Sequence, residues 1–246
     1  MNLTVFHPKY WVTWLLVPML WVVSLFPLSI IYKLGTTLGD GLYKTMSTRR
    51  KVAAQNIKLC FPNYSPDEIE IITKKTFRNI ARVALSSGIS WWSRKQRLRA
   101  LVEVRGLSHF ERALDSDQNV IILAPHFIAL EVGGIYLSMI SSITSIYQKS
   151  RNPIFDRLMI RGRSRFGAIL IERQAGTRDV IREMKKGVPL YYLPDQDPGL
   201  QWDKRKAVFA PFFGTKAATW ITLARLARIT GSTVIPCATK LLENGR

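Results

Sequence analysis

The feature that most limits the possible folds is the regular alternation of apolar and amphipathic stretches from Leu101 onward. The apolar stretches predict strands at residues 101–106, 119–125, 143–148, 168–172, 188–194, 207–213 and 232–240. The stretches between them predict helices that begin near Leu107, Ala129, Pro153, Thr177 and Lys216. Apolar strands joined through helices form parallel sheets that are covered on both faces. We therefore predict an α/β fold with a mostly parallel central sheet flanked by helices.

An uncharged apolar segment precedes this region, from Trp11 to Tyr32. It has the roughly 20 residues that a helix needs to cross a bilayer, so we expect an N-terminal membrane helix. Pro18 and Pro27 each remove a backbone donor, which leaves a second interpretation open, a broken helix half-buried in one leaflet. The basic residues that follow are Lys33, Lys44, Arg49, Arg50 and Lys51, whereas only Lys9 precedes the segment. This asymmetry predicts that the rest of the chain lies in the cytoplasm.

The sequence divides into a membrane anchor at residues 1–33, a helical region at residues 34–100 and an α/β core at residues 101–246. In the helical region we expect a short basic helix over residues 48–60 and a longer one that runs toward Trp92. The longer helix begins with Ser65, Pro66 and Glu68, which supply an N-cap, a proline in the first turn and a capping-box carboxylate.

The charge of the chain favours anionic partners. Lysine and arginine number 36 against 17 acidic residues, which gives a net charge of +19. Such an excess suits nucleic acid, anionic lipid or an acidic carrier protein, and charge alone does not choose among them. Cys60 and Cys237 lie far apart and match no zinc or redox spacing, so we expect reduced thiols and no bound metal.

The main candidate for catalysis is His126, which follows the strand predicted at residues 119–125. In open parallel sheets, functional groups gather in loops beyond the carboxyl ends of the strands. Glu131 lies five residues later and would reach back to His126 from the first turns of a helix. It would hold one imidazole nitrogen and leave the other as a general base toward a substrate hydroxyl. A lone histidine after a strand is also common as a structural residue.

A second polar loop, after the strand predicted at residues 188–194, contains Asp195 and Asp197. Two carboxylates beside a buried strand need partners, although aspartate is also an ordinary turn residue. A basic cluster before this loop contains Lys149, Arg151, Arg161, Arg163 and Arg165. Its members either bind substrate and support the site or form a solvated basic face. The Phe212-Phe213-Gly214 segment is interpreted as a structural part of a groove wall.

Five motifs follow one another along the chain: PHFIALE at residues 125–131, GRSR at 162–165, PDQDPG at 194–199, an FFG run from Phe212 and STVIP at 232–236. In these motifs the chain resembles the late acyltransferases of lipid A biosynthesis, of the lauroyl and myristoyl type, within the lysophospholipid acyltransferase superfamily. The PDQD loop replaces the FPEGT-type loop of glycerolipid acyltransferases. The resemblance covers nearly the whole chain and implies a glycerolipid acyltransferase-like fold.

The resemblance implies transfer of a fatty acyl chain from an acyl carrier protein to a hydroxyl of a lipid A precursor, in lipopolysaccharide biosynthesis. The enzyme would lie at the cytoplasmic side of the bacterial inner membrane and need no cofactor, metal or nucleic acid. His126 would be the general base, oriented by Glu131, while Arg163 and Asp195 would contact substrate or support the site. An acidic carrier and a phosphate-bearing acceptor both suit the positive charge. Relatives continue beyond Arg246, so we expect a core that is short at its C-terminus.

Three other functions stay open at this point. The first is acylation of another membrane glycolipid or glycerolipid. The second is a non-catalytic, membrane-tethered protein that binds anionic lipid through its basic face. Nucleic-acid binding ranks last, because the sequence contains no recognition motif for it.

Overall fold

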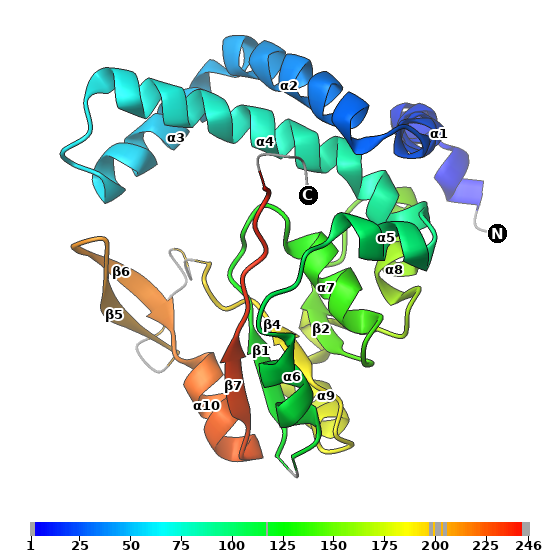
Figure 1. The fold of residues 1–246 in the computed structure, drawn as a ribbon, viewed down its shortest axis with the longest axis vertical. Coiled ribbons are helices and arrows are strands. Elements are labelled where there is room, and N and C mark those ends of the chain that lie inside the picture. The colour runs from blue at the N-terminus through cyan, green and yellow to red at the C-terminus, as the bar shows by residue number, and fades with distance from the viewer. Residues whose placement is uncertain (1–2, 117, 197–198, 200–202, 204–205, 243–246) are drawn as a thin grey trace.

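The computed structural model describes residues 3–116, 118–196, 199, 203 and 206–242, and its centre is a five-stranded parallel sheet (Figure 1). The strands are β1 (Val120–Leu123), β2 (Thr144–Tyr147), β3 (Ile169–Glu172), β4 (Leu190–Tyr192) and β7 (Thr233–Pro236). Their order is β3-β2-β4-β1-β7, and every neighbouring pair runs parallel. The predicted α/β fold with a parallel central sheet is confirmed.

Helices cover both faces of the sheet. The helices of this region are α6 (Leu107–Leu114), α7 (Leu130–Ser138), α8 (Pro153–Ser164), α9 (Thr177–Met184) and α10 (Thr222–Thr230), with a 3₁₀ turn at Arg173–Ala175. Side chains of a strand alternate between its faces. Ile122 accordingly packs with α6 and α7 through Phe110 and Leu137. Ile121 packs on the other face, with Val180 of α9 and Leu226 of α10.

Two of the predicted elements differ from the structure. Residues 207–213 do form a strand, β5 (Ala207–Phe212), but it pairs antiparallel with β6 (Thr215–Trp220), where we expected a helix. Phe213 and Gly214 both have positive φ, which closes a tight two-residue hairpin before a helix can start. The strand predicted at residues 101–106 is also wrong, because Leu101 ends α5 and residues 102–106 connect that helix to α6.

An N-terminal set of helices lies over one end of the α/β core (Figure 1). After two short 3₁₀ turns at Leu3–Phe6 and Pro8–Tyr10, it comprises α1 (Trp11–Leu25), α2 (Leu28–Thr45), α3 (Ser47–Cys60), α4 (Pro66–Trp92) and α5 (Lys95–Leu101). The predicted start of α4 is confirmed. The Ser65 hydroxyl accepts from the amide of Glu68, and the Glu68 carboxylate accepts from the amide of Ser65 at 2.8 Å. A third hydrophobic cluster, with Ile31 and Ile89 among its buried residues, joins these helices to the core.

The predicted N-terminal membrane helix is not present as a single helix. The chain leaves helical geometry at Phe26, which is extended (φ −72°, ψ 157°), and α2 begins only after Pro27. The cause is steric, since a proline disfavours helical geometry in the residue before it and donates no backbone hydrogen bond. Within the described residues, no helix has both the length and the apolar character to cross a membrane.

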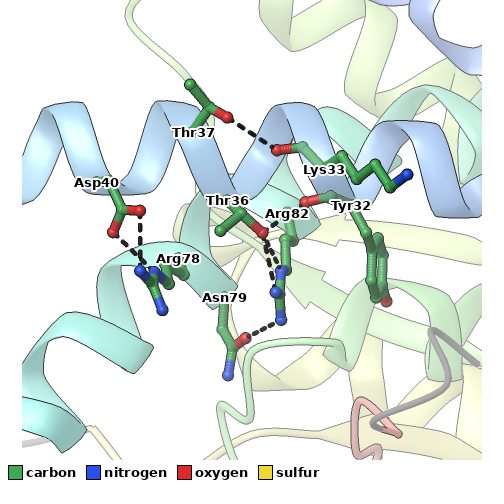
Figure 2. Close-up of polar contacts among 8 residues, drawn as sticks. All are labelled: Tyr32, Lys33, Thr36, Thr37, Asp40, Arg78, Asn79 and Arg82. Carbon is green, nitrogen blue, oxygen red and sulfur yellow. Dashed lines mark hydrogen bonds and ion pairs between the residues drawn. The ribbon is translucent and has the colours of Figure 1, made fainter.

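Helices α2 and α4 pack with their backbones in near contact. A Cβ on Gly35 would lie 2.6 Å from Cα of Arg82, and one on Gly39 would lie 2.5 Å from Cα of Arg78. Figure 2 shows the polar contacts beside these glycines. The Arg78 guanidinium forms two hydrogen bonds to Asp40, at 2.7 and 2.9 Å, and Arg82 donates to the Thr36 hydroxyl. Small residues thus set the distance between the helices, and the arginines of α4 bind polar groups of α2.

Two alanine substitutions on α2 should have opposite effects on stability. We expect Gly39→Ala to lower the free energy of unfolding by about 1–3 kcal/mol, because the new methyl group overlaps the α4 backbone. Gly41→Ala has no atom within 4 Å of its new Cβ. It should instead raise the stability by about 0.5–1 kcal/mol, the advantage of alanine over glycine within a helix. Denaturant unfolding measures both, and equal shifts would contradict the close packing.

Candidate active site

The loops after β1 and β4 bring His126 and Asp195 together. The two strands are parallel neighbours, with Leu123 opposite Tyr192, the last residue of each strand. His126 and Asp195 each lie three residues beyond these paired positions, and each follows a proline. Because parallel strands end at the same edge of the sheet, equal spacing places the two side chains side by side. The sequence prediction that both residues belong to loops at carboxyl ends of strands is confirmed.

Asp195 contacts His126 through both carboxylate oxygens. Oδ1 lies 2.6 Å from Nδ1 of the imidazole, and Oδ2 accepts from the backbone N–H of His126 at 2.7 Å. An ionised carboxylate only accepts, so Nδ1 of the neutral ring carries the hydrogen and Nε2 keeps a free lone pair. The His126 side chain remains 34% exposed. The arrangement therefore fixes the ring and its tautomer and leaves a basic nitrogen that can reach a substrate.

Glu131 has different partners from those we expected. It lies in the first turn of α7, and its two carboxylate oxygens share the single N–H of Arg163 Nε, at 3.1 Å each, while Oε2 also accepts from Nη2 at 2.5 Å. The Trp91 indole donates a further bond, at 2.7 Å. The predicted contact of Glu131 with His126 is therefore replaced by the contact with Asp195. The physical reason is that Glu131 lies beside α4 and α8, whose arginine and indole donors satisfy its carboxylate.

Glu131, Arg163 and Trp91 form what we call the Glu131 cluster, which joins three helices beside the site. Arg163 comes from α8, Trp91 from the last turn of α4, and Glu131 from α7. Gly162 in the GRSR motif makes room for this packing, because a Cβ there would lie 2.4 Å from the Trp91 ring. The Glu131 side chain is only 15% exposed, so these hydrogen bonds replace most of the water that would otherwise solvate its carboxylate.

A cavity of about 530 Å³ opens beside His126. His126, Glu131 and Arg163 all line it, together with the apolar side chains of Ile135, Ile146, Leu170 and Val180 and the polar side chains of Gln148, Arg173, Tyr191, Gln196 and Thr222. The mixture suits a substrate with a long apolar part and a polar reacting end. Among the described residues, no group of three or more His, Cys, Asp or Glu side chains is placed to hold a metal ion.

The other predicted site residues lie elsewhere. Lys149, Arg151 and Arg161 have exposed side chains and do not line the cavity, which agrees with a solvated basic face. Asp197 lies outside the described residues.

Sequence reasoning missed two residues that support the site. Trp91 completes the partners of Glu131, and no spacing in the sequence relates residues 40 positions apart. Tyr191 lies buried beneath α7, and its hydroxyl donates to the carbonyl of Leu130 at 3.1 Å. Burial raises the pKa of the Tyr191 phenol, which therefore stays protonated as a donor. Its place in a strand immediately before the Pro194-Asp195 loop was the available signal.

Removal of Arg163 should destabilise the protein. We expect Arg163→Ala to lower the free energy of unfolding by about 1–3 kcal/mol, because the Glu131 carboxylate loses its cationic partner in a poorly hydrated position. The control is Arg161→Ala on the same helix, whose side chain is exposed and should change stability by less than about 0.5 kcal/mol. Urea unfolding of both variants checks the difference, and equal effects would show that the Glu131 cluster contributes nothing specific.

An imidazole that is oriented by a carboxylate, beside a cavity with apolar walls, defines a site suited to activating a hydroxyl group of an apolar substrate. Comparison with known proteins agrees with this class. The family model for bacterial lipid A biosynthesis acyltransferases matches residues 2–245. The chain belongs to this family and is an acyltransferase.

Several relatives match most of this chain and more than two thirds of their own lengths. The lipid A biosynthesis lauroyltransferase of Escherichia coli K12 is 31% identical over 98% of this chain and 77% of its own length. A lipid A biosynthesis acyltransferase of Haemophilus influenzae is 33% identical over 93% of this chain and 71% of its own. The palmitoleoyltransferase of lipid A biosynthesis from Escherichia coli K12 is 30% identical over 93% of this chain and 74% of its own.

Proposed function

We propose that the protein transfers a fatty acyl chain from an acyl carrier protein thioester to a hydroxyl of a lipid A precursor. The observation that carries this proposal is the His126–Asp195 pair at the opening of a cavity with apolar walls. The relatives named above transfer lauroyl and palmitoleoyl groups in lipid A biosynthesis, which supports a long-chain acyl group here. The net charge of +19 suits both an acidic carrier and a phosphate-bearing acceptor.

In the proposed reaction, His126 acts as the general base. Its Nε2 takes the proton of the acceptor hydroxyl while the hydroxyl oxygen attacks the thioester carbonyl. The tetrahedral intermediate then collapses, the carbon–sulfur bond breaks, and the departing sulfur receives the proton from His126. The products are an ester on the acceptor and the free thiol of the carrier. The acceptor attacks directly, so this scheme requires no serine or cysteine nucleophile.

We assign supporting roles to the neighbouring charged groups. Asp195 positions the ring and stabilises the imidazolium that forms when His126 takes the proton. Arg163 lines the cavity and provides positive charge for the oxyanion of the intermediate, while Glu131 holds that guanidinium in place. Glu131 is therefore proposed as a positioning residue that acts through Arg163.

We also propose that the enzyme works on the cytoplasmic leaflet of the bacterial inner membrane. Helix α1 contains no charged residue and leaves large apolar side chains exposed, including Trp11, Val12, Leu15, Leu16 and Leu25. An exposed apolar helix on a strongly basic protein favours the interface of an anionic bilayer. The break at Pro27 supports an interfacial position for α1, the second of the two interpretations that the sequence left open.

The test is acyl transfer by the purified protein. The enzyme is incubated with a long-chain acyl carrier protein and a lipid A precursor, and mass spectrometry follows the acceptor. We expect one acyl chain to be added to the precursor and none to lysophosphatidic acid offered in its place. Transfer to lysophosphatidic acid alone would overturn the acceptor assignment and favour glycerolipid acylation.

A further inference from the structure

The β5–β6 hairpin begins at the cavity and extends away from the central sheet. Its last residue, Trp220, and Thr222 just beyond it both line the cavity of His126. Ala207 at the start of the hairpin is buried, so the base is anchored in the protein. From there the two strands extend toward the turn between α3 and α4 (Figure 1). The hairpin thus has the active-site cavity at its base and its tip at the far end of two short strands.

The hairpin exposes an unusual amount of apolar side chain. Val208, Phe209, Phe212 and Phe213 are 48%, 57%, 59% and 52% exposed. At the tip, Phe212 and Phe213 meet edge to face at 4.8 Å between ring centroids, and Phe213 contacts Phe61 at 5.2 Å. Phe61 in turn stacks on Tyr64. Phe61, Tyr64, Phe212 and Phe213 together form what we call the aromatic tip.

The geometry of the turn disfavours phenylalanine at position 213. Phe213 has a φ of 49°, and it is the non-glycine residue with positive φ in the described part of the chain. Two-residue hairpin turns of this kind favour asparagine, aspartate or glycine, which tolerate left-handed geometry. A bulky aromatic residue in that geometry is strained, and an exposed ring gains little from burial. Strained residues gather where the side chain serves a function.

Two exposed lysines lie close in the chain to the residues of the aromatic tip. Lys58 at the end of α3 and Lys216 on β6 both have exposed side chains, and Lys216 follows the tip residues by only a few positions. The acidic residues nearby are Asp67 and Glu68, and Glu68 is engaged in the capping box of α4. Exposed aromatic rings next to lysines are the combination that binds the interface of an anionic bilayer.

We propose that the aromatic tip inserts into the surface of an anionic bilayer and thereby holds the base of the hairpin, where the His126 cavity lies, close to the membrane. An amphiphilic acceptor could then move from the bilayer to the cavity along the exposed apolar side chains of Val208 and Phe209. The membrane contact rests on the aromatic tip and its lysines alone. Only its purpose, delivery of a lipid acceptor, rests on the proposed function.

The first test measures binding to vesicles of phosphatidylglycerol and phosphatidylethanolamine by flotation. We expect the double variant Phe212→Ser/Phe213→Asn to bind about tenfold more weakly than the wild type, because two interfacial aromatic anchors are lost. Phe213→Asn suits the turn geometry, so the hairpin should be retained. The matched control is Ile229→Ser, which removes an even more exposed apolar side chain, from α10. A control that binds as weakly as the double variant would overturn the proposal.

The second test reports the position of the tip itself, independently of any contact made by α1. A cysteine introduced as Phe213→Cys, in a background with Cys60→Ser and Cys237→Ser, carries a bimane fluorophore. We expect a blue shift on addition of vesicles and quenching by doxyl-labelled lipids. Vesicle binding without quenching would overturn the proposal. A blue shift that depends on protein concentration in the absence of vesicles would also overturn it, since a second copy of the chain would then cover the tip.

Neither measurement requires turnover, so the two proposals can fail separately. Failure of the proposed function would leave tip quenching intact but abolish acyl transfer to every acceptor tested. Failure of the membrane inference would leave transfer intact, and the double variant would then work equally well on an acceptor in vesicles or in detergent micelles. We expect instead a selective loss of about tenfold with the acceptor in vesicles.

Discussion

Replacement of His126 by alanine should lower the rate of acyl transfer by about 10²–10⁴-fold, the range typical for loss of a general base. The reason is that the two carboxylates nearest to the histidine are already engaged, Asp195 with His126 and Glu131 with Arg163, so neither replaces the imidazole as a base. The acceptor KM should change little, because the proton is removed only in the transition state. Steady-state kinetics with a long-chain acyl carrier protein measures both constants.

The control for this variant is His109→Ala. His109 is an exposed histidine on α6 whose ring contacts Arg112, and it does not line the cavity. We expect its replacement to leave the rate within about twofold of wild type, as for surface positions away from a site. A rate for His126→Ala in the same range would contradict the assignment of His126 as the base.

The second large effect is expected for Asp195→Asn. An asparagine can turn its amide N–H₂ toward Nδ1, which would favour the tautomer with hydrogen on Nε2 and remove the free lone pair. In a histidine–carboxylate pair of this kind, the loss of rate is about 10²–10⁴-fold. The loss should fall on kcat rather than on KM, and Asp195→Glu should restore part of it. A purely structural role would not give that pattern.

The comparison variant is Glu131→Gln, because Glu131 was the carboxylate that the sequence indicated as the orienting partner. In the structure it acts on Arg163, so we expect a loss of about tenfold, smaller than for Asp195→Asn, through weaker oxyanion stabilisation. The relevant measurement is the ratio of the two kcat values. If Glu131→Gln were the more damaging change, the orienting role would belong to Glu131.

How far the sequence could predict this site depends on strand order. The patterns Ala124-Pro125-His126 and Leu193-Pro194-Asp195 each end an apolar strand, so both side chains could be placed at one edge of a parallel sheet. Which loops are adjacent requires the order β4-β1, which pairing in space decides and local sequence does not. The His126–Glu131 spacing therefore looked like the closer pair. Only the positions of Trp91 and Arg163 show why Glu131 turns away.

Two of the predictions that failed, the N-terminal membrane helix and the helix near Lys216, have causes of the same kind. The uncharged run from Trp11 to Tyr32 has the composition of a membrane helix, but Pro27 divides it, and α2 then packs on α4 through Gly35 and Gly39. The hairpin was missed because Phe213 is not a residue that turn statistics favour at positive φ. Helix propensity in the following residues then suggested a helix where β6 pairs with β5.

The central claim is that His126 catalyses acylation of lipid A, and mass spectrometry of lipid A from living cells tests it most directly. A strain that lacks the gene is complemented with wild type or with His126→Ala at matched protein levels. We predict lipid A that lacks one acyl chain in the deletion strain, restored by the wild type and not by the variant. Full restoration by His126→Ala, or unchanged lipid A in the deletion strain, would contradict the account.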